Sequence, residues 1–255
     1  MNNKLKSALA LFLSTQAMSV EAVTTGNLLN FNAGTASYSS GTYSVTGSYF
    51  AMDSDGNGVF AMSERTAIAP GSDGGVVVGV SQLSSLSHGG VPDGTEISAI
   101  DQPWAFGANT GMHYSMSPTN ILTDDDARNV TLDFSGWGIT WNGIPEINMG
   151  GGTQDCGTAS DGICVAANGD DVSGVFDNGT GFATVTCGFD CAVGDTFILN
   201  YAARVPRADS SGFSAVNYSL HLEGTVKVAA VPIPAAFWLF GSGLLGLATF
   251  MRRRK

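Results

Sequence analysis

The feature that most restricts the fold of this chain is a series of short runs in which large apolar residues occupy every second position. The clearest runs cover residues 137–141, 197–203 and 218–222. Side chains alternate between the two faces of a β-strand, so each run predicts a strand with one buried face. Clusters of Gly, Asn, Asp and Ser separate such runs, and no sustained helical period lies between them. The sequence therefore predicts an all-β, antiparallel fold.

Residues 75–80 (Gly-Val-Val-Val-Gly-Val) are apolar without alternation, which predicts a strand buried on both faces. Residues 23–230 are enough for one domain with a full core, and no Pro-rich or Ser-rich linker divides them. We therefore expect a single antiparallel β-sandwich of the jelly-roll type, with a barrel as the alternative.

The last twenty-five residues, 231–255, combine three features in a fixed order: a proline motif, an uncharged segment at 235–251, and a basic cluster at the end of the chain. As a helix, the uncharged segment would be roughly 25 Å long, at the short end of what spans a bilayer. The cations that follow would stay on the cytoplasmic side, with the rest of the chain outside. The residues of the motif and the cluster are Val231, Pro232, Pro234, Arg252, Arg253 and Arg254.

This order resembles the PEP-CTERM sorting signal, in the Val-Pro-x-Pro-Ala variant because Ile233 stands in the middle of the motif. The resemblance implies anchoring in the inner membrane, cleavage near the prolines by an exosortase-like enzyme, and transfer to the cell surface or outside the cell. An ordinary C-terminal membrane anchor is the alternative. Segments 103–111, 135–143 and 220–224 resemble those of other PEP-CTERM ectodomains of unassigned function, which implies a shared fold and no chemistry.

The beginning of the chain has the features of a secretory signal peptide over residues 1–22. Lys4 and Lys6 precede an apolar run at residues 8–13, and small residues before the end of this segment suit signal peptidase. Cleavage after Ala17 is the alternative. We expect an exported protein whose partners include signal peptidase.

Charge is distributed unevenly along the chain. Residues 23–231 contain five basic and twenty-one acidic residues, a formal net charge of −16, because six of the eleven cations lie in the terminal segments. Such an acidic surface repels phosphate backbones and favours divalent cations. We therefore expect no nucleic-acid partner.

Residues 53–64 (Asp-Ser-Asp-Gly-Asn-Gly-Val-Phe-Ala-Met-Ser-Glu) match the twelve-residue spacing of a calcium-binding loop. Calcium prefers six to eight hard oxygen ligands, and Gly58 permits the sharp turn that this loop needs. The flanking residues do not have the pattern of an EF-hand helix pair, so a sensor role is not expected. The alternative is an acidic surface turn without metal. The predicted ligands are Asp53, Asp55, Asn57, the carbonyl of Val59 and Glu64.

The four cysteines predict two disulfides, because an exported chain meets an oxidising compartment. Of the three possible pairings we favour the local one, Cys156–Cys164 with Cys187–Cys191, on polar and Gly-rich connections. Zinc binding would need reduced thiolates, which such a compartment disfavours.

Motifs of catalysis are missing from the sequence: there is no nucleophile elbow, no zinc-protease helix motif, no phosphate loop and no dinucleotide fingerprint. We therefore do not expect an enzyme, although the carboxylate pair of a glycosidase has no fixed spacing in sequence. Trp104 is a candidate for stacking on a sugar ring, whereas the pair Trp137 and Trp141, on one face of a strand, is more typical of a core.

Together these observations predict a calcium-stabilised β-sandwich of the cell envelope or extracellular matrix, with a structural or adhesive role. The alternatives are a module that binds exopolysaccharide and, third, a polysaccharide-active hydrolase.

Overall fold

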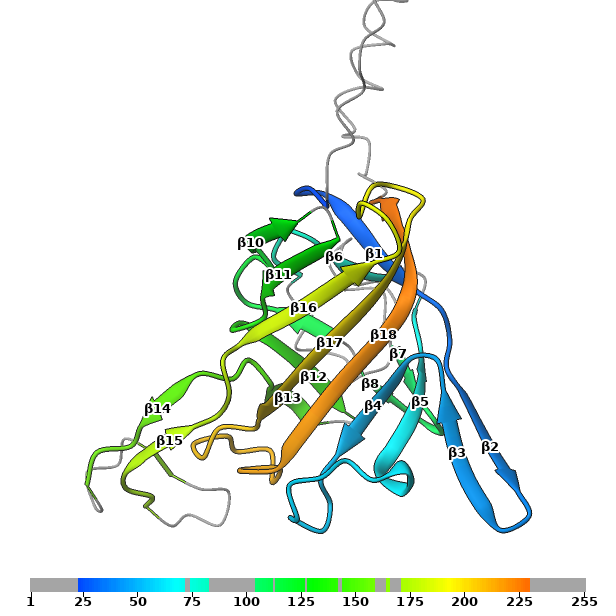
Figure 1. The fold of residues 1–255 in the computed structure, drawn as a ribbon. Helices are drawn as coiled ribbons and strands as arrows, with labels where there is room; N and C mark the ends of the chain where they lie inside the picture. Colours follow the sequence, from blue (N-terminus) through cyan, green and yellow to red (C-terminus); the bar gives the residue numbers. More distant parts are fainter. Residues whose placement is uncertain are drawn as a thin grey trace, which may run out of the picture.

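The computed structural model describes residues 23–71, 74–82, 104–111, 113–126, 128–141, 144–158, 164–165 and 171–229 (Figure 1). Regular structure in these residues consists of β-strands and one 3-10 turn, η1 (Met62–Glu64). The strand pairs of this part of the chain are antiparallel. The prediction of an all-β, antiparallel fold is confirmed.

The largest sheet of the described residues has eleven strands. Nine form its main path, in the order β10 (Ile121–Asp126), β11 (Asn129–Asp133), β16 (Phe182–Cys187), β17 (Thr196–Arg204), β18 (Asn217–Val228), β4 (Tyr49–Met52), β5 (Arg65–Ala69), β7 (Trp104–Phe106) and β8 (Asn109–Gly111).

The sheet forks at β18, its longest strand. One edge of β18 pairs with β17 from Asn217 to Thr225. On the other edge, the first part of β18 pairs with β4 and its last part pairs with β1 (Asn27–Phe31), which in turn pairs with β6 (Gly75–Val77). Gly224 of β18 allows β1 to lie this close, since a Cβ at position 224 would be 2.1 Å from the carbonyl oxygen of Asn30 in β1.

A second sheet and two hairpins complete the regular structure. The second sheet has three strands, and Figure 1 shows it behind β16, β17 and β18 of the large sheet. Its strands, in order, are β13 (Ile144–Asn148), β12 (Trp137–Trp141) and β9 (His113–Ser115). The hairpins are β2 (Thr35–Ser39) with β3 (Thr42–Thr46), and β14 (Thr153–Asp155) with β15 (Val175–Asp177).

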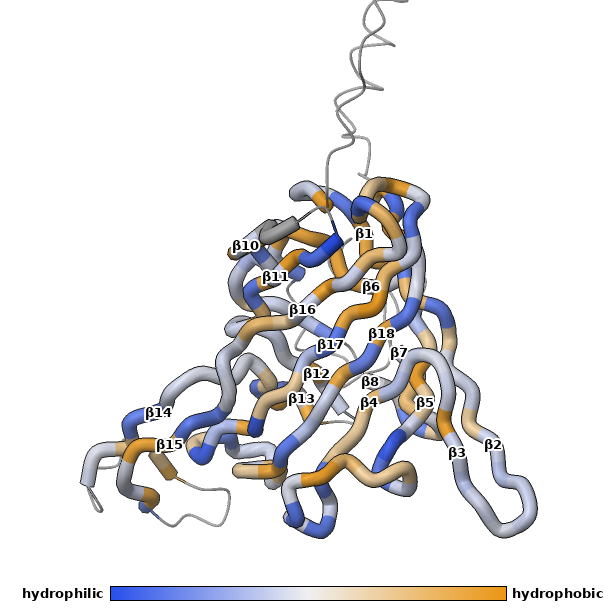
Figure 2. The backbone as a smooth tube through the Cα atoms, in the orientation of Figure 1, coloured by the Kyte–Doolittle hydropathy of each residue, from blue (hydrophilic) through white to orange (hydrophobic). Residues whose placement is uncertain are grey.

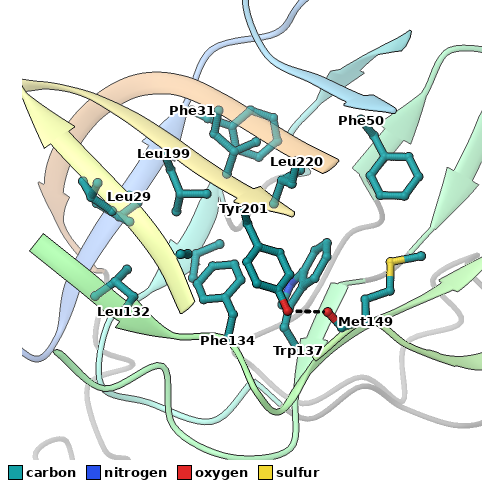
Figure 3. Packing of buried hydrophobic residues seen from close by; sticks show 14 of the residues in the cluster. Leu29, Phe31, Phe50, Leu132, Phe134, Trp137, Met149, Leu199, Tyr201 and Leu220 are labelled. Atoms are coloured by element: carbon teal, nitrogen blue, oxygen red, sulfur yellow. Dashed lines mark hydrogen bonds between the residues drawn. The ribbon is translucent and has the colours of Figure 1, made fainter. Parts of the chain in front are cut away.

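The apolar core lies between these two sheets. Alternate residues of β17 and β18 are buried, as predicted, and Figure 2 shows the alternation of hydropathy along both strands. Trp137 and Ile139 of β12 face them from the second sheet, and Trp141 packs at the margin of the core. The hydroxyl of Tyr201 donates to the carbonyl oxygen of Met149 over 2.7 Å and so joins the layers (Figure 3). This arrangement is consistent with a β-sandwich.

The strand predicted over residues 75–80 is shorter than expected. β6 ends at Val77, and the chain turns at Gly79, whose φ of +72° favours glycine. The amide of Gly79 donates to the carbonyl of Thr119 instead of continuing the ladder with β1. Val80 is 38 % exposed, so the prediction of burial on both faces is wrong at this end.

The predicted signal peptide (1–22) and the predicted sorting signal (231–255, with its helix at 235–251) lie outside the described residues. The helical structure that is described offers no segment with the length and hydrophobicity of a membrane span.

Candidate metal site

The loop at residues 53–64 connects β4 to β5 through η1. Its first residue is attached to the start of β18, because the amide of Asp53 donates to the carbonyl of Asn217 over 2.9 Å. Gly56 and Gly58 have φ values of +72° and +80°, which permit the tight turn. A strand enters the loop and a single 3-10 turn followed by a strand leaves it, so the flanks are not the helix pair of an EF-hand, as the sequence predicted.

Three carboxylates of this loop converge. One oxygen each of Asp53, Asp55 and Glu64 lie within 4.8 Å of one another, and this is the group of metal-ligating side chains found in the described part of the chain. Asp53 is buried with 4 % exposure, Asp55 is exposed, and Glu64 lies between the two. Three hard anionic oxygens at this spacing can hold a metal ion.

The carboxylate of Asp53 accepts hydrogen bonds from its own loop and from the distant strand β18. Its Oδ1 accepts the amide of Asn57 over 3.0 Å, and its Oδ2 accepts the amide of Gly58 over 2.9 Å. The Nδ2 of Asn217 donates to the same Oδ2 over 2.9 Å. These bonds fix the orientation of the carboxylate toward the inside of the loop.

Glu64 closes the loop from its other end. Its Oε1 accepts the amide of Ser54 over 2.6 Å and the hydroxyl of Ser54 over 2.8 Å. Its Oε2 accepts the amide of Ala61 over 3.0 Å. Both carboxylate oxygens therefore face the backbone of the loop, where a bidentate ligand would be required.

The two remaining predicted ligands are otherwise engaged. The Oδ1 of Asn57 accepts the amide of Val59 over 2.7 Å, while its Nδ2 donates to Oδ2 of Asp55 over 2.8 Å. The carbonyl of Val59 accepts the amide of Ala61 over 3.1 Å. The structure thus brings together three of the five predicted ligands, and leaves Asn57 and Val59 in the hydrogen bonds of the turn.

The hydrogen bonds favour the ionised form of two of the acids. The amide of Asn217, with smaller help from the amides of Gly58 and Asn57, lowers the pKa of Asp53 although burial opposes this. The hydroxyl of Ser54, followed by the amides of Ala61 and Ser54, lowers the pKa of Glu64. Both groups are therefore anionic at neutral pH, as cation binding requires.

Sequence reasoning missed Asn217 and Ser54. Asn217 lies 164 residues from Asp53, and nothing in its sequence context signals the contact. Its own Oδ1 accepts Nε of Arg204 over 2.9 Å, so a chain of bonds connects the loop to β17. Ser54 occupies the second position of the loop, where the calcium motif specifies no residue.

The predicted disulfides are confirmed, with Cys156 bonded to Cys164 and Cys187 to Cys191, and the described residues contain no free cysteine. The expectation that both close polar loops needs correction for the second pair. Cys187 is the last residue of β16, and both Cys187 and Cys191 belong to the apolar core. This disulfide therefore fixes the end of a core strand.

The structure corrects the prediction that Trp104 stacks on a sugar ring. Trp104 has 0 % exposure and packs against the rings of His113, with 4.1 Å between centroids, and Phe31, with 4.8 Å. Its neighbour across the core, Trp137, is also buried, as expected for a core residue. Neither indole is open to a ligand.

No family model, curated protein or solved structure matches this chain.

Proposed function

We propose that the loop at residues 53–64 binds calcium and that the ion stabilises an exported structural or adhesive protein. The observation that carries the proposal is the convergence of Asp53, Asp55 and Glu64 in a loop with calcium-binding spacing. Calcium accepts flexible sets of carboxylate and carbonyl oxygens, and Asn57 and the Val59 carbonyl would supply two more oxygens if they left the hydrogen bonds of the turn.

The surroundings of the loop support a structural role for the ion. The loop joins two strands and is bonded to a third through Asn217, and it lacks the helix pair that opens in calcium sensors. Binding would therefore fasten β4, β5 and β18 together. Two disulfides, suited to an oxidising compartment, support the same kind of protein. We further propose that the strands of the two sheets form a single jelly-roll sandwich.

Export and processing form the second part of the proposal. Its support is the PEP-CTERM-like order of Val231, Pro232 and Pro234, the uncharged segment and the terminal cations, together with the signal-peptide pattern of residues 1–22. We expect signal peptidase to remove the first segment and an exosortase-like enzyme to cleave near Pro234. Mass spectrometry of the protein from the cell surface should then find no peptide beyond that residue; intact peptides containing Arg252 would contradict the cleavage.

Thermal melting in the presence of calcium and in the presence of a chelator tests whether the loop binds calcium. Extracellular calcium modules have dissociation constants of about 10⁻⁴–10⁻³ M, so about 3 mM calcium would add about 0.8–2 kcal/mol to the free energy of unfolding by mass action. For a chain of this size the melting temperature should rise by about 2–8 °C. Equal melting temperatures in calcium and in chelator would show that the loop is an acidic turn.

Two substitutions distinguish ligation from folding. Glu64→Gln removes a proposed ligand charge and should abolish most of the calcium-dependent rise. Asp195→Asn is the matched control, because Asp195 also accepts backbone amides in a loop, those of Phe189, Asp190 and Cys191, but is not part of the cluster. This control should lower the melting temperature equally with and without calcium.

A further inference from the structure

The outer face of β17 and β18 carries a row of side chains that point away from the core. The strands are paired in register, so outward residues lie opposite each other in five successive pairs. The row spans the nine residues of β17, and the eight steps between them cover about 26 Å at the rise of a β-strand. The pairs are Thr196 with Thr225, Ile198 with Glu223, Asn200 with His221, Ala202 with Ser219, and Arg204 with Asn217.

Three clefts follow this row from end to end. The first, of about 340 Å³, lies at Arg204 and Asn217 beside the metal loop, and the second, of about 320 Å³, lies at Asn200 and His221. These two share Phe60 and Ala202, so they are continuous. The third, of about 370 Å³, begins two residues further along each strand, at Ile198 and Glu223. The three clefts lie one after another along the row and are together called the outer groove.

Aromatic side chains stand beside a floor of small residues in the middle of the outer groove. Ala202 and Ser219 form the floor, and Phe182 and Phe60 line the same cleft. Phe182 is 51 % exposed although it lies in a strand, and Phe60 is half-buried. An exposed aromatic ring beside a small-residue floor leaves a flat apolar surface on which a sugar ring can stack.

Polar side chains of the groove are held in fixed positions. Nδ1 of His221 donates to Oδ1 of Asn200 over 2.7 Å, and its Nε2 lies 3.0 Å from Oε1 of Glu223. The ring of Tyr49 stacks on the imidazole, with 4.9 Å between centroids, and the guanidinium of Arg65 lies over Tyr49. Because Oδ1 of Asn200 is directed at the imidazole, the amide nitrogen of Asn200 is oriented as a donor for a hydroxyl group.

The charge of the groove favours an uncharged ligand. The lining of the middle cleft includes no Lys, Arg, Asp or Glu. Asp177 and Arg204 line the first cleft, and Glu223 lines the third. The chain as a whole has a formal net charge of −11, which repels acidic polymers. Aromatic surfaces and amide, hydroxyl and imidazole groups without a dominant charge match the hydroxyl groups and the flat C–H faces of neutral sugars.

We propose that the outer groove binds a neutral polysaccharide chain, which lies along β17 and β18 with a sugar ring against Phe182 and a hydroxyl group hydrogen-bonded to Asn200. This proposal goes beyond calcium binding and does not depend on it. The length of the groove accommodates several consecutive sugar rings, so the ligand is a chain rather than a monosaccharide.

Isothermal titration calorimetry of the full-length chain tests whether the outer groove binds oligosaccharides. The probes are cellohexaose, mannohexaose, xylohexaose and maltohexaose, with the matching disaccharides and with hexagalacturonate as an acidic probe. We expect at least one neutral hexasaccharide to bind, more tightly than its disaccharide and with little dependence on salt. Absence of binding by all four neutral hexasaccharides, or tighter and salt-sensitive binding of hexagalacturonate, would overturn the proposal.

Variants locate the binding. Phe182→Ala and Asn200→Ala change exposed side chains. Each should lower the affinity for the hexasaccharide about tenfold. Tyr38→Ala is the matched control, because Tyr38 is 75 % exposed on the β2–β3 hairpin and is not among the residues that line the groove. Melting temperatures confirm that the variants are folded. Loss of affinity in the control equal to that of Phe182→Ala would refute the location.

Discussion

Replacement of Tyr201 by Phe tests the contact that connects the two layers of the fold. Tyr201 lies on β17 of the large sheet with 3 % exposure, and its hydroxyl donates to Met149 immediately after β13 of the second sheet. Burial raises the pKa of Tyr201, so the hydroxyl remains a protonated donor at every pH at which the protein would be studied.

The substitution removes one oxygen and leaves the ring in place. The ring contacts with Phe134, at 5.1 Å between centroids, and with Trp137, at 6.0 Å, should therefore persist. What is lost is the partner of a buried carbonyl, which costs about 1–3 kcal/mol. A loss of about 2 kcal/mol would lower the melting temperature of a chain of this size by about 4–8 °C.

Thermal or urea unfolding followed by circular dichroism measures this loss. Tyr38→Phe is the control for the same chemical change at a side chain that is 75 % exposed, and it should leave stability unchanged. If Tyr201→Phe melts within one degree of the wild type, the hydroxyl does not hold the layers together and the reasoning is wrong.

Two further predictions concern the disulfide in the core and the response to acid. The double variant Cys187→Ala, Cys191→Ala should lose about 2 kcal/mol of stability because its short loop is no longer closed, measured by urea unfolding under non-reducing conditions; an unchanged urea midpoint would contradict this. The pKa values of Asp53 and Glu64 are lowered in the folded chain, so ionisation of these two acids stabilises the fold. This stabilisation is fully present above their ordinary pKa values of 3.8 and 4.5, and it is lost as the pH falls through the lowered pKa values. The melting temperature in chelator should therefore fall on acidification below about pH 4, less so in Asp53→Asn, and an identical pH profile in that variant would argue against the role of Asp53.

The alternation of apolar and polar residues in the sequence predicted the strands that form the core. Every second residue of 197–203 and 218–222 lies on the buried face of β17 or β18, because a period of two fixes which side chains share a face. The run at residues 75–80 was harder to interpret, since a continuous apolar segment does not show where pairing stops. Gly79 ends the strand there through its backbone conformation.

Local spacing predicted only part of the candidate site. The order of acids between Asp53 and Glu64 was sufficient to locate three converging carboxylates. Asn217 comes from the other end of the chain, so only the pairing of β18 with β4 reveals that it holds Asp53. The outer groove was equally hidden, because Phe182, Asn200 and His221 belong to three different strands and become neighbours through sheet register alone.

The position of β18 in the sheet determines when this protein can fold. It is the last strand of the described chain, yet it supplies the common partner of β1, β4 and β17, and it brings Val228 beside Asn27 from near the other end of the described residues. A growing chain therefore exposes several unpaired strand edges until about residue 228 has been synthesised. Folding should be slow and should follow synthesis, since contacts between distant residues form late. A chain that ends before Asn217 should aggregate rather than form a smaller version of the fold.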